Sequence, residues 1–485
     1  DRLAEKMQVP TADFTRFKRE VTQHLRQGTL VKLKKNRVCL PRDADLITGI
    51  VKFRQSGSAT LYPDLVEGRD TPPPYHILAE DTAVAMHRDR VVCRIHHDRR
   101  GFRSRSKQGG GPRQAANQPE TVRVIRILER ANTTLAGTLK RSRMFHYVIP
   151  DDPRIIQDIL VPDPRKSSLS PRPKIDDKVI VRLAPWEQRH LNPEGTILEV
   201  LGKTHTPSAE YQALLHNYNL NPDFPEAVLN EVATLEDTVK ASERKGRKDL
   251  RAVYTVTIDP QAAKDFDDAL TMEKLKDGTF RVGVHIADVS HYVRPGTALD
   301  REARKRGNST YLVGTVIPML PHALSNGLCS LVEGEDRLTK SVFILFHENG
   351  TVKGAEFADT VINSNKRLTY EQAYDFLFEK NLRAVTARPD PPAHQTGSTG
   401  RSLKTLKKAE LELIRNLLQD LWSIASKARA RRMQAGSLEL DMPETKIYVD
   451  PEGWADRIVR VEQDESHQLI EEFMLAANES VARAL

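Results

Sequence analysis

Residues 259–268 of this chain read Asp-Pro-Gln-Ala-Ala-Lys-Asp-Phe-Asp-Asp and directly follow a β-type run at 252–258. The segment brings four carboxylates together: Asp259, Asp265, Asp267 and Asp268. Like charges at this spacing repel one another, so the cluster is stable mainly when a cation neutralises it. Ligation by oxygen alone suits magnesium, manganese or calcium rather than zinc. The stretch therefore predicts a divalent-cation site where a β-strand ends.

The composition bounds the class of protein. A chain of 485 residues is too long for one typical domain, and roughly three or four domains are expected. No apolar run approaches the length of a membrane span, and the first residues contain no apolar signal core. Three scattered cysteines, Cys39, Cys93 and Cys329, indicate a reducing compartment without a disulfide framework or a zinc ligand set. We therefore expect a cytoplasmic protein with no membrane partner.

The charge balance points to the kind of ligand. The formal net charge is +8 and the isoelectric point is about 9.2, which favours a polyanionic partner such as nucleic acid. An acidic cluster inside a basic protein is best explained as a magnesium site that acts on phosphates. The chain starts at Asp1 rather than at a methionine, so we expect a fragment or a processed product.

Residues 1–44 are predicted to form a winged-helix-like N-terminal unit. Apolar residues recur at helical spacing over 12–25, and two short β-type runs follow at 30–33 and 38–40. The basic stretch at 34–37 lies between these runs, as at the tip of a β-wing. Alone, this pattern is weak support for nucleic-acid binding.

Residues 45–130 are predicted to form a first small β-barrel of the cold-shock or OB type. The β-type runs lie at 47–53, 58–62, 82–86 and 90–95. A Gly- and Arg-rich stretch near 97–118 is predicted to be a mobile loop. This loop is either a solubilising insertion or a contact for RNA.

Residues 131–205 are predicted to form a second barrel of the same type. Its β-type runs lie at 135–139, 179–183 and 195–200, and the first of them repeats the apolar-x-Gly-x-apolar opening of the run at 47–51. Such barrels bind single strands through aromatic stacking on a basic face. Phe145, His146 and Tyr147 are candidates for stacking, and ordinary packing within the barrel is the alternative.

Residues 206–485 have a mixed α and β pattern, which predicts an α/β catalytic domain. Asp277-Gly278 between two β-type runs is a strong hairpin signal. The Pro-, Gly- and Ser-rich residues 384–402 predict a disordered insertion, and a long amphipathic helix is expected over 403–428. A last helix begins near Ser466 and is expected to be cut off at the end of the chain.

The stretch Val256-Thr-Ile-Asp-Pro-Gln-Ala-Ala-Lys-Asp-Phe-Asp-Asp-Ala269 resembles the catalytic signature of the ribonuclease II / ribonuclease R exoribonucleases. The resemblance continues in register through residues 283–293, 295–312 and 467–478. A winged helix followed by two cold-shock barrels is similar to the order of domains in the ribonuclease R branch. The resemblance covers essentially the whole chain.

The resemblance implies magnesium-dependent hydrolysis of RNA from its 3′ end to nucleoside 5′-monophosphates, with manganese as a substitute metal. It implies that Asp259, Asp265, Asp267 and Asp268 build the metal centre, and that Asp267 is the one most tied to turnover. A pair of magnesium ions about 4 Å apart can activate water and stabilise the leaving oxygen. The alternative is a calcium loop or a solvated acidic turn, but the D-x-D-x-D-G pattern of an EF-hand is absent.

The resemblance also implies RNA contacts. Tyr311 matches an aromatic that stacks on the 3′-terminal base, and a half-buried strand tyrosine is its alternative. Tyr370 and Glu471 match family residues near the RNA, although Glu471 could equally form a salt bridge on a helix surface. His285 and His291 lie in matching blocks, and we expect both to be structural histidines rather than metal ligands.

Two departures from the family pattern stand out. Leu440 takes the place of a phenylalanine that helps to clamp the last bases in relatives, so base clamping is expected to be weaker. The chain is also expected to end inside the catalytic domain, before an arginine that holds the scissile phosphate and before a further OB-type domain.

The favoured hypothesis is a processive 3′-to-5′ exoribonuclease that acts on single-stranded RNA, as a monomer, with the ribosome or RNA-decay factors as further partners. One alternative is an RNA-binding or regulatory protein with an inactive or incomplete nuclease domain. Another is a DNA-binding regulator that binds through the winged helix. This alternative does not explain the aspartates.

Overall fold

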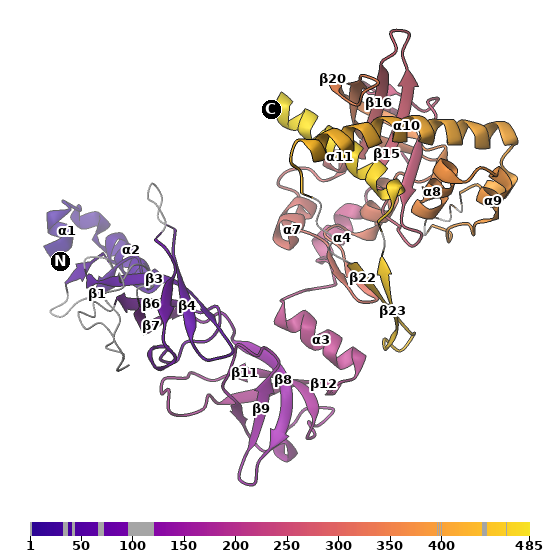
Figure 1. Cartoon of the computed structure of the whole chain (residues 1–485). Helices are drawn as coiled ribbons and strands as arrows, with labels where there is room; N and C mark the ends of the chain where they lie inside the picture. The colour runs from indigo at the N-terminus through magenta and orange to yellow at the C-terminus, as the bar shows by residue number, and fades with distance from the viewer. Residues whose placement is uncertain are drawn as a thin grey trace, which may run out of the picture. The chain divides into compact units, whose positions relative to one another are not determined.

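The computed structural model (Figure 1) divides into two compact units, Asp1–Leu220 and Asn221–Leu485. It describes residues 2–32, 37–40, 44–65, 72–95, 121–394, 396, 398, 400–438, 444–461 and 463–485. The predicted basic loop near 97–118, residues 34–36 of the predicted wing tip and Leu440 lie outside the described residues. None of the described helices is both long enough and apolar enough to span a lipid bilayer.

The N-terminal part is helical and ends in a β-hairpin. Its helices are α1 (Arg2–Lys6) and α2 (Phe14–Gln27), and the hairpin pairs β1 (Val31–Lys32) with β2 (Val38–Cys39). Gly28, with φ of 78°, terminates α2 in the left-handed conformation that glycine tolerates. The order of a helix followed by a β-hairpin is the one that the sequence predicts.

The first unit contains two five-stranded antiparallel sheets with the same strand order. The first sheet has the order β5-β4-β3-β6-β7 and the second has the order β10-β9-β8-β11-β12. The strands of the first are β3 (Leu46–Phe53), β4 (Ala59–Pro63), β5 (Tyr75–Ile77), β6 (Arg90–Ile95) and β7 (Val122–Glu129). Those of the second are β8 (Thr134–Arg141), β9 (His146–Pro150), β10 (Ile159–Val161), β11 (Asp177–Leu183) and β12 (Gly195–Lys203).

In each sheet, the two edge strands are bridged to each other. A parallel bridge connects His76 in β5 with Thr121, the residue before β7, and another connects Leu160 in β10 with Glu194, the residue before β12. The inward-facing residues of each sheet form their own apolar cluster. Both features are expected when a five-stranded sheet closes on itself around a small core.

The predicted strand at 82–86 is wrong. These residues form turns after a 3-10 helix, and Ala83 has a positive φ of 49°, which a strand does not accommodate. The Thr82 hydroxyl donates to Ala79 O, and Met86 N donates to the side chain of Asp89. These local bonds replace a strand ladder. Two strands of this sheet were not predicted: β5, a run of only three residues, and β7.

The helix α3 (Pro207–Asn217) belongs to the first unit. It packs on the second sheet, where His216 Nε2 lies 3.0 Å from Thr134 Oγ1 and Lys178 Nζ lies 2.9 Å from Glu210 Oε2. The first compact unit therefore includes this helix and extends to Leu220.

The second unit is built on a mixed seven-stranded sheet of order β13-β20-β19-β16-β15-β14-β21. Its strands are β13 (Lys248–Asp249), β14 (Val256–Asp259), β15 (Asp268–Lys274), β16 (Phe280–Ala287), β19 (Asp336–Phe346), β20 (Val352–Asn363) and β21 (Lys366–Thr369). Most neighbours are antiparallel, but β14 runs parallel to β21 and β13 runs parallel to β20. The predicted hairpin at Asp277-Gly278 joins β15 to β16, and Gly278 has a φ of 81°.

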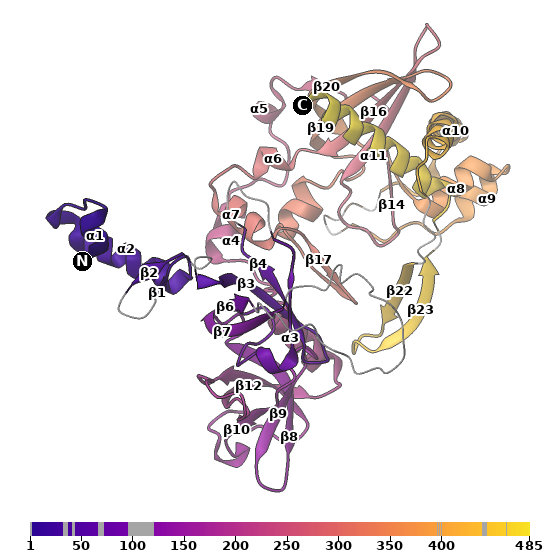
Figure 2. The ribbon, with the colours of Figure 1, turned by 60° about the vertical axis from the view of Figure 1, so that its left-hand side comes forward.

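Helices cover both faces of this sheet. The helices α8 (Tyr370–Phe378), α10 (Lys408–Gln434) and α11 (Glu465–Ala484) share one apolar cluster with it, and α10 and α11 lie beside its strands in Figure 2. The other face packs against α4 (Glu226–Val232), α6 (Val289–Tyr292), α7 (Ala298–Arg306) and the segment 319–332. The predicted long helix and last helix are thus present.

Two small ribbons and one segment complete the unit. The ribbons are β17–β18 (Thr310–Leu312 and Thr315–Ile317) and β22–β23 (Glu444–Val449 and Ala455–Val461). The expectation of a disordered insertion at 384–402 is wrong for its described residues. Helix α9 (Leu382–Ala387) ends inside this range. After it, Pro389 O accepts a hydrogen bond from Gln372 Nε2 in α8, and His394 Nε2 donates to Lys264 O. Ser402 Oγ donates to Asp390 Oδ2 within the segment itself.

Candidate metal and RNA site

The four aspartates lie where two neighbouring strands begin and end. Asp259 is the last residue of β14, opposite Thr369 of the parallel strand β21. Asp268 is the first residue of β15, which is antiparallel to β14. The intervening loop turns the chain back, so Asp265 and Asp267 lie on the bend between the two strands. The sequence spacing and the strand pairing together gather the carboxylates at one end of the sheet.

Burial and mutual repulsion dominate the electrostatics of these carboxylates. Asp259 is only 7% exposed, and burial together with the charge of Asp268 raises its pKa well above the usual range, while Arg367 acts in the opposite direction. Burial and the neighbouring Asp267 raise the pKa of Asp268 to about 6. Burial, and then Asp265, also raises the pKa of Asp267. The raised pKa values mean that ionisation of these carboxylates is unfavourable without a cation, and a bound cation would favour it.

Unpaired oxygen atoms point to the same conclusion. Asp259 Oδ2 and Asp268 Oδ2 are buried and have no hydrogen-bond partner, although buried polar atoms are nearly always paired. Within the described part of the chain, no three histidine, cysteine or acidic side chains are close enough together to hold a metal ion as they stand. The donor set therefore suits a hard cation such as Mg²⁺, but its side chains would have to draw together around it.

Two of the predicted RNA-contacting residues lie beside the aspartates. Tyr311, in β17, is 70% exposed, and its pKa is raised by partial burial and by Asp265 and Asp267. Tyr370 is the first residue of α8, and its pKa is raised to about 12 by burial and then by Asp259. The exposed ring of Tyr311 is free to stack on a base, whereas the ring of Tyr370 is half-buried.

Glu471 lies on the exposed side of α11. Its Oε1 is 3.5 Å from Arg432 Nη2, so it takes part in the surface ion pair that the sequence left open as its alternative role. The adjacent Glu472 is buried and bonds to the same guanidinium more closely.

The two histidines of the matching blocks are structural, as expected. His285 is fully buried, with Nε2 2.9 Å from Thr271 Oγ1 and Nδ1 2.7 Å from Ser341 Oγ, and burial lowers its pKa to about 3. His291 Nε2 lies 3.0 Å from Glu243 Oε1. Both rings are engaged by side chains other than the aspartates.

Sequence reasoning missed Arg367 and His467. Arg367, in β21, is 6% exposed and faces Asp259, and this depends on the parallel pairing of β14 with β21, which no sequence pattern reveals. His467 stacks on Tyr370, with ring centroids 3.8 Å apart and planes at 13°. Its Nδ1 is 2.8 Å from Asp464 Oδ1, the carboxylate that caps α11. The Asp-x-x-His spacing at the start of a predicted helix was the available signal for this pair.

An aromatic group is exposed on the second sheet of the first unit. Phe145, in the turn between β8 and β9, is 49% exposed, and its ring lies edge-on to that of Tyr147, 6.0 Å away. Met144 beside it is 89% exposed. The described hairpin thus presents an apolar tip flanked by Lys140 and Arg143.

Comparisons with protein families identify both parts of this arrangement. The RNB domain family matches residues 247–485, and a cold shock domain family matches residues 147–225. Ribonuclease R of Thermotoga maritima is 36% identical over 485 residues, which cover 99% of this chain and 61% of that protein. The chain therefore spans less than two thirds of the length of this relative.

Solved structures show the same fold. RNase R of Mycoplasma genitalium, in complex with ribose-methylated single-stranded RNA, superposes with a TM-score of 0.73 at 24% identity, and covers 90% of this chain and 62% of that one. Yeast Ssd1, described as a pseudonuclease, superposes with a TM-score of 0.60 at 18% identity, over 91% of this chain and 55% of that one.

Proposed function

The chain belongs to the RNB-domain family, and we propose that it is a magnesium-dependent 3′-to-5′ exoribonuclease that hydrolyses single-stranded RNA to nucleoside 5′-monophosphates. The observation that carries the proposal is the set of four clustered aspartates, two of which keep a buried oxygen without a partner. A basic chain supplies the attraction for the phosphates of RNA.

Asp259, Asp265, Asp267 and Asp268 would hold the magnesium. When bound, divalent cations of this kind supply a nucleophilic water and stabilise the charge on the leaving oxygen. The carboxylates would orient the cations and compensate their charge, and the buried Asp259 and the buried Oδ2 of Asp268 would face the side of the site that is shielded from water. We assign to Asp267 the role on which turnover depends most.

Tyr311, Tyr370 and Glu471 would position the 3′ end of the RNA. The exposed ring of Tyr311 beside Asp265 is suited to stacking on a terminal base, which is worth roughly 1–3 kcal/mol for a base on an aromatic. Tyr370 is held by its stack on His467, so its hydroxyl has little freedom to turn away. Glu471 would accept a hydrogen bond from the RNA only after leaving Arg432.

The first unit would deliver the RNA. We assign its two sheets to cold-shock-type barrels and the N-terminal helix with its hairpin to a winged helix. Phe145 and Tyr147 would stack on bases, with Lys140 and Arg143 near the backbone phosphates. Binding through such a basic surface should weaken steeply as salt rises.

A second function, RNA binding without hydrolysis, is favoured by one observation. The acidic side chains of the described site do not stand in a ligating arrangement. A protein of this kind would bind RNA and leave it intact.

One experiment separates the two functions. RNA with a single-stranded 3′ extension is incubated with Mg²⁺ and the wild-type chain, beside Asp267→Asn. We expect wild type to release nucleoside 5′-monophosphates, and Asp267→Asn to bind RNA with unchanged affinity but to hydrolyse it at least about 100-fold more slowly. Intact RNA that is nevertheless bound by wild type would favour the second function. Equal rates for the two proteins would show that the site is assigned wrongly.

A further inference from the structure

The strap is defined here as the described residues of the Pro- and Gly-rich range between α9 and α10, namely 388–394, 396, 398 and 400–402. It contacts the loop that carries the aspartates. His394 Nε2 donates to Lys264 O at 2.6 Å. Pro392 O accepts a long bond, 3.5 Å, from Arg367 Nη1. His394 is 5% exposed. A segment whose composition predicts disorder is therefore fastened beside the carboxylates.

Arg367, in strand β21 of the sheet, donates hydrogen bonds to the same loop. Its Nη2 donates to Gln261 O at 3.0 Å and to Ala263 O at 3.3 Å, with Pro260 O at 3.5 Å. These carbonyls belong to the turn between Asp259 and Asp265. One buried guanidinium thus fixes the backbone that separates the first carboxylate from the other three. A lysine in its place has no planar fork with which to bond several carbonyls at once.

Phe266 is the point where the two contacts converge. It lies between Asp265 and Asp267 and is 1% exposed. The Arg367 guanidinium carbon is 4.4 Å from its ring centroid, and the His394 ring centroid is 5.3 Å away. Since Phe266 is flanked in the chain by two of the aspartates, fixing its ring and backbone fixes the directions in which their side chains leave the loop.

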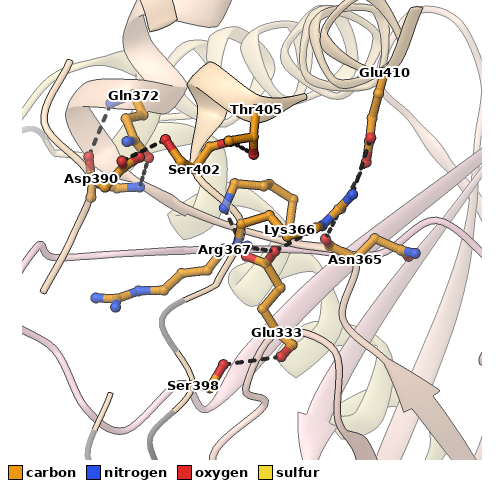
Figure 3. Close-up of polar contacts among 12 residues, drawn as sticks. Glu333, Asn365, Lys366, Arg367, Gln372, Asp390, Ser398, Ser402, Thr405 and Glu410 are labelled. Carbon is orange, nitrogen blue, oxygen red and sulfur yellow. Dashed lines mark hydrogen bonds and ion pairs between the residues drawn. The ribbon is translucent and has the colours of Figure 1, made fainter. Parts of the chain in front are cut away.

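Buried Glu333 ties the strap to Arg367 (Figure 3). Its Oε2 accepts from Lys366 Nζ at 2.8 Å and from the backbone N of Arg367 at 2.9 Å, while its Oε1 accepts from Arg401 N at 2.8 Å. Gly400 has a φ of +63°, and a Cβ there would lie 2.8 Å from Glu333 Oε2. The strap can approach Glu333 this closely because residue 400 is glycine.

We propose that Arg367 is a positioning residue for the carboxylate cluster, and that the strap, through His394 and Glu333, holds it in place. The role rests on the proposed function, because it concerns the binding of the divalent cation by the aspartates. Arg367 touches neither the RNA nor the cation in this scheme. It sets the position of Asp259 relative to Asp265 and Asp267, so that the side chains need to move less when they close around the ion.

The test measures cation affinity separately from activity. Mn²⁺ binding to the full chain is measured by calorimetry for wild type, Arg367→Lys and His394→Ala, and RNA affinity and hydrolysis rate are measured on the same proteins. Residues that orient metal ligands typically contribute 10–100-fold to metal affinity, so we expect Arg367→Lys to bind Mn²⁺ about 10-fold or more weakly. We expect a smaller loss in His394→Ala, unchanged RNA affinity in both variants and a lower kcat in both.

Arg415→Lys is the matched control. Arg415 also donates two guanidinium hydrogen bonds to carbonyls, Glu379 O at 2.7 Å and Lys380 O at 3.3 Å, but these carbonyls follow α8 and not the aspartate turn. Its loss should lower thermal stability and leave the Mn²⁺ affinity unchanged. A general loss of stability in Arg367→Lys would therefore be distinguished from a specific loss of cation binding.

The outcomes separate the two proposals. Wild-type affinity for Mn²⁺ in both Arg367→Lys and His394→Ala would overturn the positioning role and leave the proposed function intact. An equal loss of Mn²⁺ affinity in Arg415→Lys would overturn it as well. If Arg367→Lys does not fold, His394→Ala decides alone. Failure of the wild-type chain to bind Mn²⁺ would overturn the proposed function, and the positioning role with it.

Discussion

Individual buried carboxylates in this protein are of two kinds, and the difference lies in their partners. Asp89 in the first unit is fully buried, yet its oxygens accept from Arg130 at 2.6 Å, from Met86 N at 2.7 Å and from Ala131 N at 3.0 Å. Asp259 is almost as deeply buried and leaves Oδ2 without a partner. The partners of Asp89 compensate part of the cost of burying its charge, whereas Asp259 Oδ2 keeps a lone pair for a ligand.

Asp268, whose Oδ2 also lacks a partner, should make the stability of the fold depend on pH. Its pKa is raised from 3.8 to about 6, so folding binds a proton. The resulting stability is complete below 3.8 and is lost as the pH rises through about 6. In metal-free buffer, we expect the free energy of unfolding of wild type to fall relative to Asp268→Asn over this range, by on the order of 3 kcal/mol.

Denaturant titrations of wild type and Asp268→Asn across this pH range check the prediction. Saturating Mg²⁺ should abolish most of the fall in wild type, because the cation stabilises the ionised carboxylate. Curves for the two proteins that stay parallel without metal would show that Asp268 ionises normally in the folded chain.

At the scale of the elements, the two sheets of the first unit repeat the same local construction. Gly49 in β3 pairs with Pro63 at the end of β4, and Gly137 in β8 pairs with Pro150 at the end of β9. In both glycines, a Cβ would lie within 2.4 Å of a carbonyl oxygen of the partner strand. The shared apolar-x-Gly-x-apolar opening thus marks a close approach of two strands, and it is an internal repeat rather than a coincidence of composition.

The next residue extends the repeat. Asp64 follows Pro63 and pairs with Arg90 at 2.7 Å, and Asp151 follows Pro150 and pairs with Lys178 at 2.8 Å. In each sheet the basic partner lies near the start of the fourth strand of the sheet order, which is β6 in the first sheet and β11 in the second. The ion pair therefore connects the same two strands in both sheets.

Gly137→Ala should be strongly destabilising. The new methyl group would lie 2.4 Å from Ile149 O and 2.6 Å from Val148 Cγ1, and neither strand can move away without breaking the sheet ladder. We expect a loss of roughly 2–4 kcal/mol in thermal or denaturant unfolding of the first unit.

Gly354→Ala in β20 is the matched control. It is also a strand glycine, but no atom lies within 4 Å of its Cβ position and its φ is not positive. We expect it to change stability by less than about 1 kcal/mol, or to increase it slightly. Equal losses in the two variants would contradict the steric explanation.

At the scale of the whole molecule, the chain forms two compact units with separate apolar clusters. The four aspartates all lie in Asn221–Leu485. A ligand that binds only there should stabilise only that unit, since stabilisation by binding acts on the part that unfolds with the site.

Calorimetric unfolding tests this division. We expect two transitions for the wild-type chain, and Mg²⁺ at about 100 times its Kd should raise the midpoint of one of them by roughly 5–10 °C. Gly137→Ala should lower the other transition. A single transition that Mg²⁺ shifts as a whole would show that the two units unfold together.

The sequence by itself determined the broad class of the fold and the prediction of a carboxylate site. The Asp277-Gly278 turn and the amphipathic spacing of α10 are local signals, and the structure contains both elements. The apolar run at 82–86 is also a local signal, but it did not form the predicted strand. The carboxylates of Asp259, Asp265, Asp267 and Asp268 lie within ten consecutive residues, so a cation site can be predicted there without coordinates.

Tertiary structure alone decided which residues surround those carboxylates. Arg367 is more than a hundred positions from Asp259 in the chain and meets it because β21 runs parallel to β14. His394 reaches Phe266 from a segment whose composition predicts disorder, because Glu333 and Lys264 supply partners that composition cannot anticipate. Local patterns specify elements and ligand types. The contacts between distant segments depend on strand pairing and on the partners that buried polar groups find, and these exist only once the chain has folded.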